Sequence, residues 1–202
     1  MFLRVQQGFP AQAYPAPDDR TVGTAQTAAN AVANNIDNFG IIPAQAMGLA
    51  LITVVGQCVG AEAWDQVRRY TVKLVKLAYF CTWGLNAVLL AGLPLILRLY
   101  SLSPETQWYA TVLIFIHNGC AMLLWPMAFT MPNALRATGD VKVPMVISVC
   151  SMVGVRLGCS YILGVHFGLG VIGVWIAMVG DWVVRILFFM LRARQVLWKR
   201  HP

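Results

Sequence analysis

Charged residues are scarce in this sequence, and apolar residues are abundant. Only 11% of its 202 residues are Asp, Glu, Lys or Arg, whereas soluble domains carry about one quarter, and 58% are hydrophobic. This composition excludes an ordinary soluble domain and predicts a chain embedded in membrane lipid. The net charge of +7 does not indicate a nucleic-acid partner, because the basic residues fall at the ends of apolar runs and form no patch rich in aromatics.

Motifs for metal binding, cofactor binding and catalysis are also missing. The five cysteines stand singly inside apolar runs, without a C-x-x-C pair or a histidine at ligand spacing, and we expect them to pack as small side chains. The sequence has no nucleophile paired with a base and no phosphate-binding glycine loop. We therefore predict that the chain is not an enzyme and holds no metal or organic cofactor.

The sequence does contain long apolar runs, which predict an all-α, polytopic transmembrane bundle of about five helices. At a rise of about 1.5 Å per residue, about twenty apolar residues cross a hydrocarbon core of about 30 Å. Residues 1–21 contain no such run and predict an irregular tail. The expected helices cover about 22–59, 66–98, 105–131, 142–165 and 170–194, and a basic tail covers 195–202.

Proline and glycine positions predict how these helices bend and pack. Pro43 is expected to kink the first helix. Three pairs of glycines four residues apart, Gly56 with Gly60, Gly154 with Gly158 and Gly164 with Gly168, are expected to let helices approach closely.

A polar seam over residues 131–145, M-P-N-A-L-R-A-T-G-D-V-K-V-P-M, predicts the turn between the third and fourth helices. Pro132 and Pro144 lack an N–H and disfavour helical geometry in the residue before them, and Gly139-Asp140 supplies turn chemistry.

The basic residues predict the orientation of the bundle. If successive spans alternate in direction, ten basic residues share the side of the seam, and three (Arg4, Arg20 and Arg98) lie on the other. Basic residues in short loops favour the cytoplasm, so we expect the seam and the C-terminus on the cytoplasmic side of a plasma membrane. The ten residues are Arg68, Arg69, Lys73, Lys76, Arg136, Lys142, Arg192, Arg194, Lys199 and Arg200.

Asp37 stands about fifteen residues inside the first helix, where a lone carboxylate costs about 2.5–3.5 kcal/mol on insertion scales. A cation or proton site would offset that cost, with Asn34 and Asn38 supplying oxygen ligands of the kind that Na⁺ accepts. The alternative is a protonated or water-solvated carboxylate on a wet helix face. His117 in the third helix is a further candidate for proton coupling, or else a neutral imidazole hydrogen-bonded between helices.

Asp181, Arg185 and Arg156 predict a charge cluster in the last two helices. Asp181 and Arg185 are four residues apart and can pair along one helix surface. In an antiparallel pair of helices, the depth of Arg156 agrees with that of Asp181 within about 3 Å by helix rise. The cluster is either a structural ion pair or a proton relay in which Asp181 changes its partner.

Four stretches of sequence occur in an order that carries a family resemblance. They are P-A-Q-A-M-G-L-A-L-I-T-V-V-G-Q-C-V-G-A from Pro43, R-R in the following loop, P-N-A-L-R-A-T-G-D-V-K from Pro132 and G-V-W from Gly173. Together they resemble the C-terminal half of a MATE (multidrug and toxic compound extrusion) transporter over about residues 22–194. The loop motif of that family falls on Asn133, Arg136, Gly139 and Asp140.

This resemblance implies an antiporter that exports drugs or organic cations in exchange for Na⁺ or H⁺, with the substrate held between two lobes. The stretches correspond to helices eight to twelve of twelve, so the first helix of this lobe and the whole N-terminal lobe have no counterpart here. A single lobe encloses no complete pathway. We therefore expect transport only with the missing N-terminal lobe or a second copy as partner.

The same resemblance leaves two alternatives and shows one departure. The alternatives are a non-transporting truncated fragment or partner subunit, and a related flippase for a lipid-linked sugar. The departure lies in the third helix, where some family members carry an acidic cation ligand ahead of the loop motif and this chain has Leu124, Trp125 and Pro126.

Overall fold

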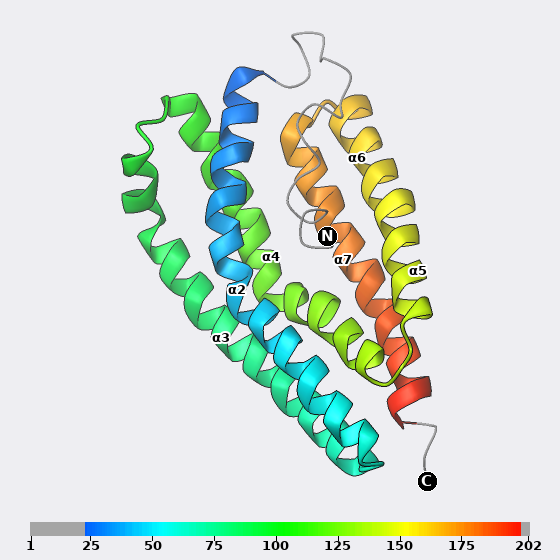
Figure 1. Ribbon diagram of the computed structural model, residues 1–202. Coiled ribbons are helices and arrows are strands. Elements are labelled where there is room, and N and C mark those ends of the chain that lie inside the picture. The colour runs from blue at the N-terminus through cyan, green and yellow to red at the C-terminus, as the bar shows by residue number, and fades with distance from the viewer. Residues whose placement is uncertain (1–22, 199–202) are drawn as a thin grey trace.

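The computed structural model describes residues 23–198 and is helical almost throughout, which confirms the predicted all-α class (Figure 1). No strand occurs within this range. Five helical segments in it are long and apolar enough to cross a membrane. The predicted tail over 1–21 and the end of the predicted basic tail, 199–202, lie outside the described residues.

The first three segments are single helices, and the last two combine α-helix with π-helical turns, labelled η. Their bounds are α2 Thr24–Gly60, α3 Trp64–Leu99, α4 Pro104–Ala137, a fourth segment of α5 Lys142–Ser151, η2 Met152–Leu157, α6 Gly158–Tyr161 and η3 Ile162–His166, and a fifth of α7 Gly170–Ala193 and η4 Arg194–Trp198.

The third helix begins and ends at residues whose chemistry explains its length. Ser103 caps the N-terminus of α4 by accepting the N–H of Thr106 at 3.3 Å, and Pro104 fits the first turn, where no N–H is needed. At the other end, α4 continues to Ala137 and does not stop near residue 131 as expected. Pro132 lies buried inside the helix, where it removes only one backbone bond.

The turn between the third and fourth segments is correspondingly shorter than the predicted seam. It covers 138–141, and Gly139 adopts a φ of 87°, a left-handed conformation that suits glycine. The C-terminal boundary differs too, because η4 continues the helix to Trp198 where a tail from residue 195 was expected. Val196 and Leu197 are both buried against the core, and this burial favours the helical ending.

α4 is the centre of the bundle. It packs against α2 and α3 on one side and against α7 on the other, while α5 and α6 lie outermost, against α7 (Figure 1). α2 and α4 form the most extensive contact, because small residues let their backbones approach. Ala29 and Ala33 of α2 and Ala110 of α4 are all fully buried in one apolar cluster at this contact.

The helices bend where proline interrupts them, and the predicted glycines differ in how closely they are packed. α2 passes through Pro43 without a break and changes direction there, as expected (Figure 1). The predicted glycines Gly56 and Gly154 have open space where a Cβ would stand. Close approach occurs at Gly40 and Gly173, where a Cβ would meet neighbouring atoms at 2.6 and 2.7 Å, and the atoms beside Gly173 include the backbone of the predicted Gly164.

Candidate functional site

The candidate site is a buried polar cluster around Asp37 in the interior of the bundle. Asn118 Nδ2 donates a hydrogen bond to Asp37 Oδ1 at 3.0 Å, and His117 Nδ1 lies 3.4 Å from Asp37 Oδ2. The second separation is within ion-pair range, although its geometry is not that of a hydrogen bond. Both partners belong to α4, so the tight α2–α4 contact brings two separately predicted residues, Asp37 and His117, together.

A third helix contributes Asn86 to the same cluster. Its Nδ2 donates to the carbonyl oxygens of Gly40 at 2.9 Å and Thr82 at 2.8 Å. A Cβ on Gly40 would lie 2.6 Å from Asn86 Oδ1 and 2.9 Å from Asn118 Oδ1. The side-chain amide oxygens of Asn86 and Asn118 therefore lie close to Gly40, one turn after Asp37 on α2. Only glycine leaves enough space for them there.

Three oxygen atoms of this cluster are buried without a hydrogen-bond donor among residues 23–198. They are Asp37 Oδ2, Asn86 Oδ1 and Asn118 Oδ1. Buried acceptors are nearly always hydrogen-bonded, and each unsatisfied one costs about 1–3 kcal/mol. Oxygen atoms that converge around one carboxylate in this way can accept a small cation, and a proton on Asp37 would provide a donor for one of them.

Aromatic side chains from α7 hold the imidazole of His117 in place. The rings of Trp175 and Trp182 meet it edge to face, with centroids at 5.4 and 5.1 Å. Trp175 is itself fixed, because its Nε1 donates to Asn30 Oδ1 at 2.9 Å. Gln26, one turn before Asn30, accepts the backbone N–H of Val171, so α2 and α7 are tied at two successive turns.

Asn34 and Asn38, the two predicted oxygen ligands, lie apart from the buried cluster. Both side chains are exposed, and Asn34 Nδ2 donates back to its own helix at Asn30 O. At about 100° per residue, Asn38 lies about 100° and Asn34 about 60° from Asp37 around the helix axis, so neither points in the same direction as Asp37. In this structure the polar partners of Asp37 come from α4.

The second charged site joins Asp181 and Arg185 within α7. Arg185 Nε lies 3.0 Å from Asp181 Oδ2, and its guanidinium stands 5.6 Å above the ring of Phe129. Ser151 of α5 donates its hydroxyl to Asp181 Oδ1, and the carbonyl of Ser148 accepts a bond from Arg185. This pair is therefore a buried, hydrogen-bonded link between α7 and the fourth segment.

The third member of the predicted charge cluster has a different environment. Arg156 lies in η2, which has no fully buried residue, and its own side chain is half-buried. A chain of aromatic contacts instead connects the Asp181–Arg185 pair to the Asp37 cluster. The ring of Trp182 makes edge-to-face contacts with the rings of both His117 and Phe129. The guanidinium of Arg185 stands over that Phe129 ring.

The predicted loop motif links the end of α4 to α7. Asn133 and Arg136 stand on the last turns of α4, where Arg136 donates to Asn133 Oδ1 at 2.9 Å, while Gly139 and Asp140 form the turn itself. Asp140 Oδ2 accepts a short bond of 2.6 Å from Arg192 Nε of α7. The motif thus fixes the end of α4 and the turn against α7.

Sequence reasoning missed Asn86 and Gly40 as members of the central cluster. Asn86 carried one usable signal, since it is a strongly polar residue within the apolar run F-C-T-W-G-L-N-A-V-L-L. Gly40 carried none, because only the distances to Asn86 and Asn118 show why a side chain is excluded there.

Five helices long and apolar enough to cross a membrane, with a carboxylate, an imidazole and an ion pair buried between them, define a polytopic membrane protein. A family model, MatE, matches residues 20–162, and the chain belongs to this family of transporters, as its motifs predicted.

Curated relatives agree with this assignment. The probable multidrug resistance protein YoeA of Bacillus subtilis is 27% identical over 178 residues, which cover 88% of this chain and 38% of YoeA. The uncharacterized transporter YisQ of the same organism is 26% identical, covering 81% of this chain and 36% of YisQ. The probable multidrug resistance protein NorM of Thermotoga maritima is 27% identical, covering 83% of this chain and 37% of NorM. The chain thus spans well under half the length of these relatives, and no solved structure matches it significantly.

Proposed function

We propose that this chain forms the C-terminal lobe of an antiporter that exports drugs or organic cations in exchange for Na⁺ or H⁺, and that the cluster around Asp37 binds the coupling ion. The observation that carries this proposal is the buried Asp37 carboxylate with unsatisfied amide oxygens from two further helices beside it. Membrane proteins rarely bury an ionisable group at such cost unless it is paired or functional.

The geometry supports either coupling ion. For Na⁺, the oxygens of Asp37, Asn86 and Asn118 offer one negative charge and two neutral dipoles. For H⁺, the contact between Asp37 and His117 provides two groups that can share or exchange a proton. In both cases binding joins α2, α3 and α4 at one point, so it would favour one arrangement of these helices over another.

Transport by this lobe requires a partner in the proposal, because alternating access comes from the rocking of one lobe against another around a shared site. The missing N-terminal lobe or a second copy of the chain would provide the opposing surface. The names of YoeA and NorM as probable multidrug resistance proteins support drugs or organic cations as the exported class.

Ion binding to the purified chain tests the coupling site independently of transport. Asp37→Asn removes the charge, and Asp65→Asn is the matched control, because Asp65 is fully exposed at the start of α3. We expect the thermal unfolding midpoint in detergent to rise with Na⁺ concentration, or to depend on pH, in the parent and in Asp65→Asn but not in Asp37→Asn. Equal responses in all three would exclude this site.

Transport is measured in liposomes that contain the chain at a known oligomeric state. We expect ethidium, an organic cation, to move under an imposed Na⁺ or pH gradient only where two lobes are present, and Asp37→Asn to abolish the gradient dependence. Ethidium flux from a demonstrated monomer would refute the need for a partner lobe. Ethidium flux that depends on the gradient equally in the parent and in Asp37→Asn would refute coupling at this cluster.

A further inference from the structure

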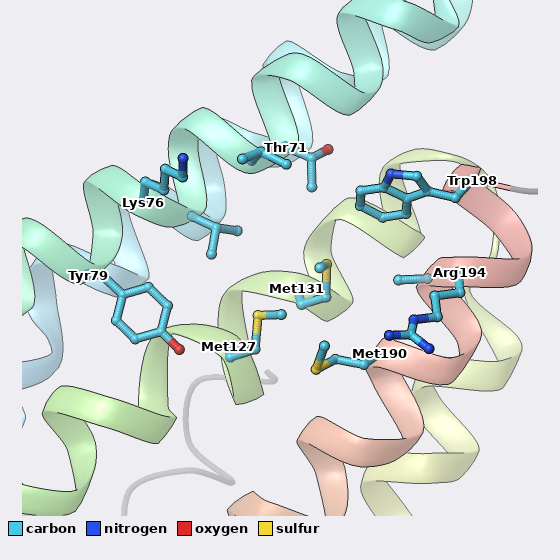
Figure 2. A pocket seen from close by; sticks show the side chains of 11 residues that line it. Thr71, Lys76, Tyr79, Met127, Met131, Met190, Arg194 and Trp198 are labelled. Carbon is cyan, nitrogen blue, oxygen red and sulfur yellow. The ribbon is translucent and has the colours of Figure 1, made fainter.

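A cavity of about 430 Å³ lies between α3, α4 and the last segment, toward the end of the bundle that carries most of the basic residues (Figure 2). Its volume falls within the range of about 300–1,000 Å³ that is typical of ligand sites. Met127 and Met131 of α4 line its inner side, while Lys76 projects from α3 and Arg194 and Trp198 from η4 (Figure 2). This cavity is separate from the Asp37 cluster and shares no residue with it.

The inner wall of the cavity suits a flexible hydrocarbon chain. Met190 of α7 joins Met127 and Met131 there, together with Val75. Methionine is unbranched and polarisable, so a wall of methionines adapts to chains of variable shape. Val75 and Met131 are buried, whereas Met190 is partly open to the surroundings of the bundle, so the cavity can be reached from the membrane.

The mouth of the cavity is positively charged. Lys76 and Arg194 are both exposed and reach the cavity from different helices. No acidic residue lines the cavity, and among residues 23–198 neither cation makes an ion pair with a carboxylate. An anion between these two side chains would therefore be attracted without displacing an existing partner.

The aromatic residues at the mouth favour the boundary between lipid chains and headgroups. Trp198 is 43% exposed at the end of η4, and Tyr79 fixes its hydroxyl by donating to Leu123 O at 2.9 Å. Rings of this kind, with an apolar body and a polar edge, concentrate at the headgroup level of bilayers. Basic pockets between helices at the cytoplasmic side bind anionic lipid headgroups.

We propose that this cavity binds one anionic phospholipid of the adjacent leaflet, with its headgroup attracted by the charges of Lys76 and Arg194 and the first part of an acyl chain against the three methionines. The charge at the mouth excludes the organic cations of the proposed transport function, because like charges repel. The site therefore belongs to the lipid surroundings of the bundle, and its existence does not depend on transport.

The test is native mass spectrometry of the full chain, purified and delipidated in detergent and titrated with dioleoylphosphatidylglycerol. Dioleoylphosphatidylcholine is the zwitterionic control, and inorganic phosphate tests whether the anion suffices without its acyl chains. We expect one phosphatidylglycerol to bind at least about tenfold more tightly than phosphatidylcholine, and inorganic phosphate not to compete at equal concentration.

Two pairs of substitutions with equal loss of charge locate the site. Lys76→Gln with Arg194→Gln removes the cations of the cavity, whereas Arg69→Gln with Lys73→Gln removes two exposed cations of α3 that do not line it. We expect the first pair to weaken phosphatidylglycerol binding about tenfold or more and the second pair to change it much less.

Met190→Trp provides a test that leaves every charge in place. Met190 is 38% exposed on α7, so a larger side chain there fills the cavity without entering the packed core. We expect it to reduce lipid binding while the thermal unfolding midpoint stays near that of the parent. The proposal would be overturned if both lipids bound equally, or if the two pairs of substitutions weakened phosphatidylglycerol binding equally. Unchanged lipid binding in Met190→Trp, or a lipid-free dimer that buries the cavity, would also overturn it.

Discussion

Asp37 illustrates how a single residue becomes tolerable inside a membrane helix. Its carboxylate contacts two side chains of one neighbouring helix, α4: the imidazole of His117 and the amide of Asn118. Asp181 obtains its cation, Arg185, from its own helix four residues away. Asp181 also accepts the hydroxyl of Ser151 of α5, while Arg185 donates to the carbonyl of Ser148. Arg185 Nε lies 3.0 Å from Asp181 Oδ2 and donates to Oδ1 at 3.1 Å. Asp37 Oδ2 instead faces the imidazole of His117 at 3.4 Å and stands beside two amide oxygens that have no donor among residues 23–198, and this difference is why we assign ion binding to Asp37.

Gly40→Ala tests how tightly the central cluster is packed. The new methyl group would lie 2.6 Å from Asn86 Oδ1, so we expect a loss of about 1–3 kcal/mol in unfolding free energy. Gly56→Ala is the control on the same helix, because no atom stands within 4 Å of its Cβ position. Alanine there should be neutral or stabilising by up to about 1 kcal/mol. Thermal and denaturant unfolding in detergent measure both; equal effects would contradict the close approach.

The buried pair in α7 makes a second prediction. Arg185→Met leaves Asp181 uncompensated at a fully buried position, and we expect a loss of about 3 kcal/mol or more in unfolding free energy. The double variant with Asp181→Leu removes both charges and should recover part of that loss. A double variant less stable than Arg185→Met would show that Asp181 is held by Ser151 and not by the arginine.

At the scale of elements, α4 is central to the architecture, because it packs against α2, α3 and α7 and provides both polar contacts of Asp37. Its C-terminal end is fixed by the turn over 138–141 and by the bond from Arg192 to Asp140. A chain break or slip at this turn would shift α4 along the bundle and separate His117 from Asp37.

The Asp140–Arg192 contact can be tested by a double-mutant cycle. Both side chains are partly exposed, so we expect a coupling free energy of only about 0.5–1 kcal/mol in unfolding, reduced at high salt. Asp140→Asn and Arg192→Gln should each be mildly destabilising, and their effects should not add. Additive losses would show that the turn is held by its backbone alone.

Hydropathy was sufficient to predict the helices, but not the partners of their polar residues. Length and apolar content identified five spans, and spacing predicted the Asp181–Arg185 pair, because both signals are local. The contact of Asp37 with Asn118 joins residues 81 apart and depends on how α2 bends and on which small residues meet α4. The end of α4 was predicted too early, near residue 131, because proline disfavours an isolated helix. Pro132 is tolerated here inside a packed bundle, and α4 continues to Ala137.

At the scale of the whole molecule, the two ends of the bundle differ sharply in charge. Between residues 23 and 198, eight of the eleven Lys and Arg residues lie at the end that holds the turns 61–63 and 138–141, while Arg98 lies at the other end and Arg156 and Arg185 between. In Figure 1 the basic end is the one where α3 and α5 begin and the last segment finishes. It favours a cytoplasmic position for this end.

Cysteine accessibility measures this orientation in intact cells. In a chain whose five cysteines are replaced, Val141→Cys places a thiol in the exposed turn after α4, and Ser101→Cys places one at the opposite end of the bundle. Neither change alters the charge. We expect a membrane-impermeant maleimide to label Ser101→Cys in intact cells and Val141→Cys only after permeabilisation. The reverse labelling pattern would show that the basic end faces the outside of the cell. The lipid that we propose beside Lys76 and Arg194 would then belong to the outer leaflet, which contains fewer anionic headgroups.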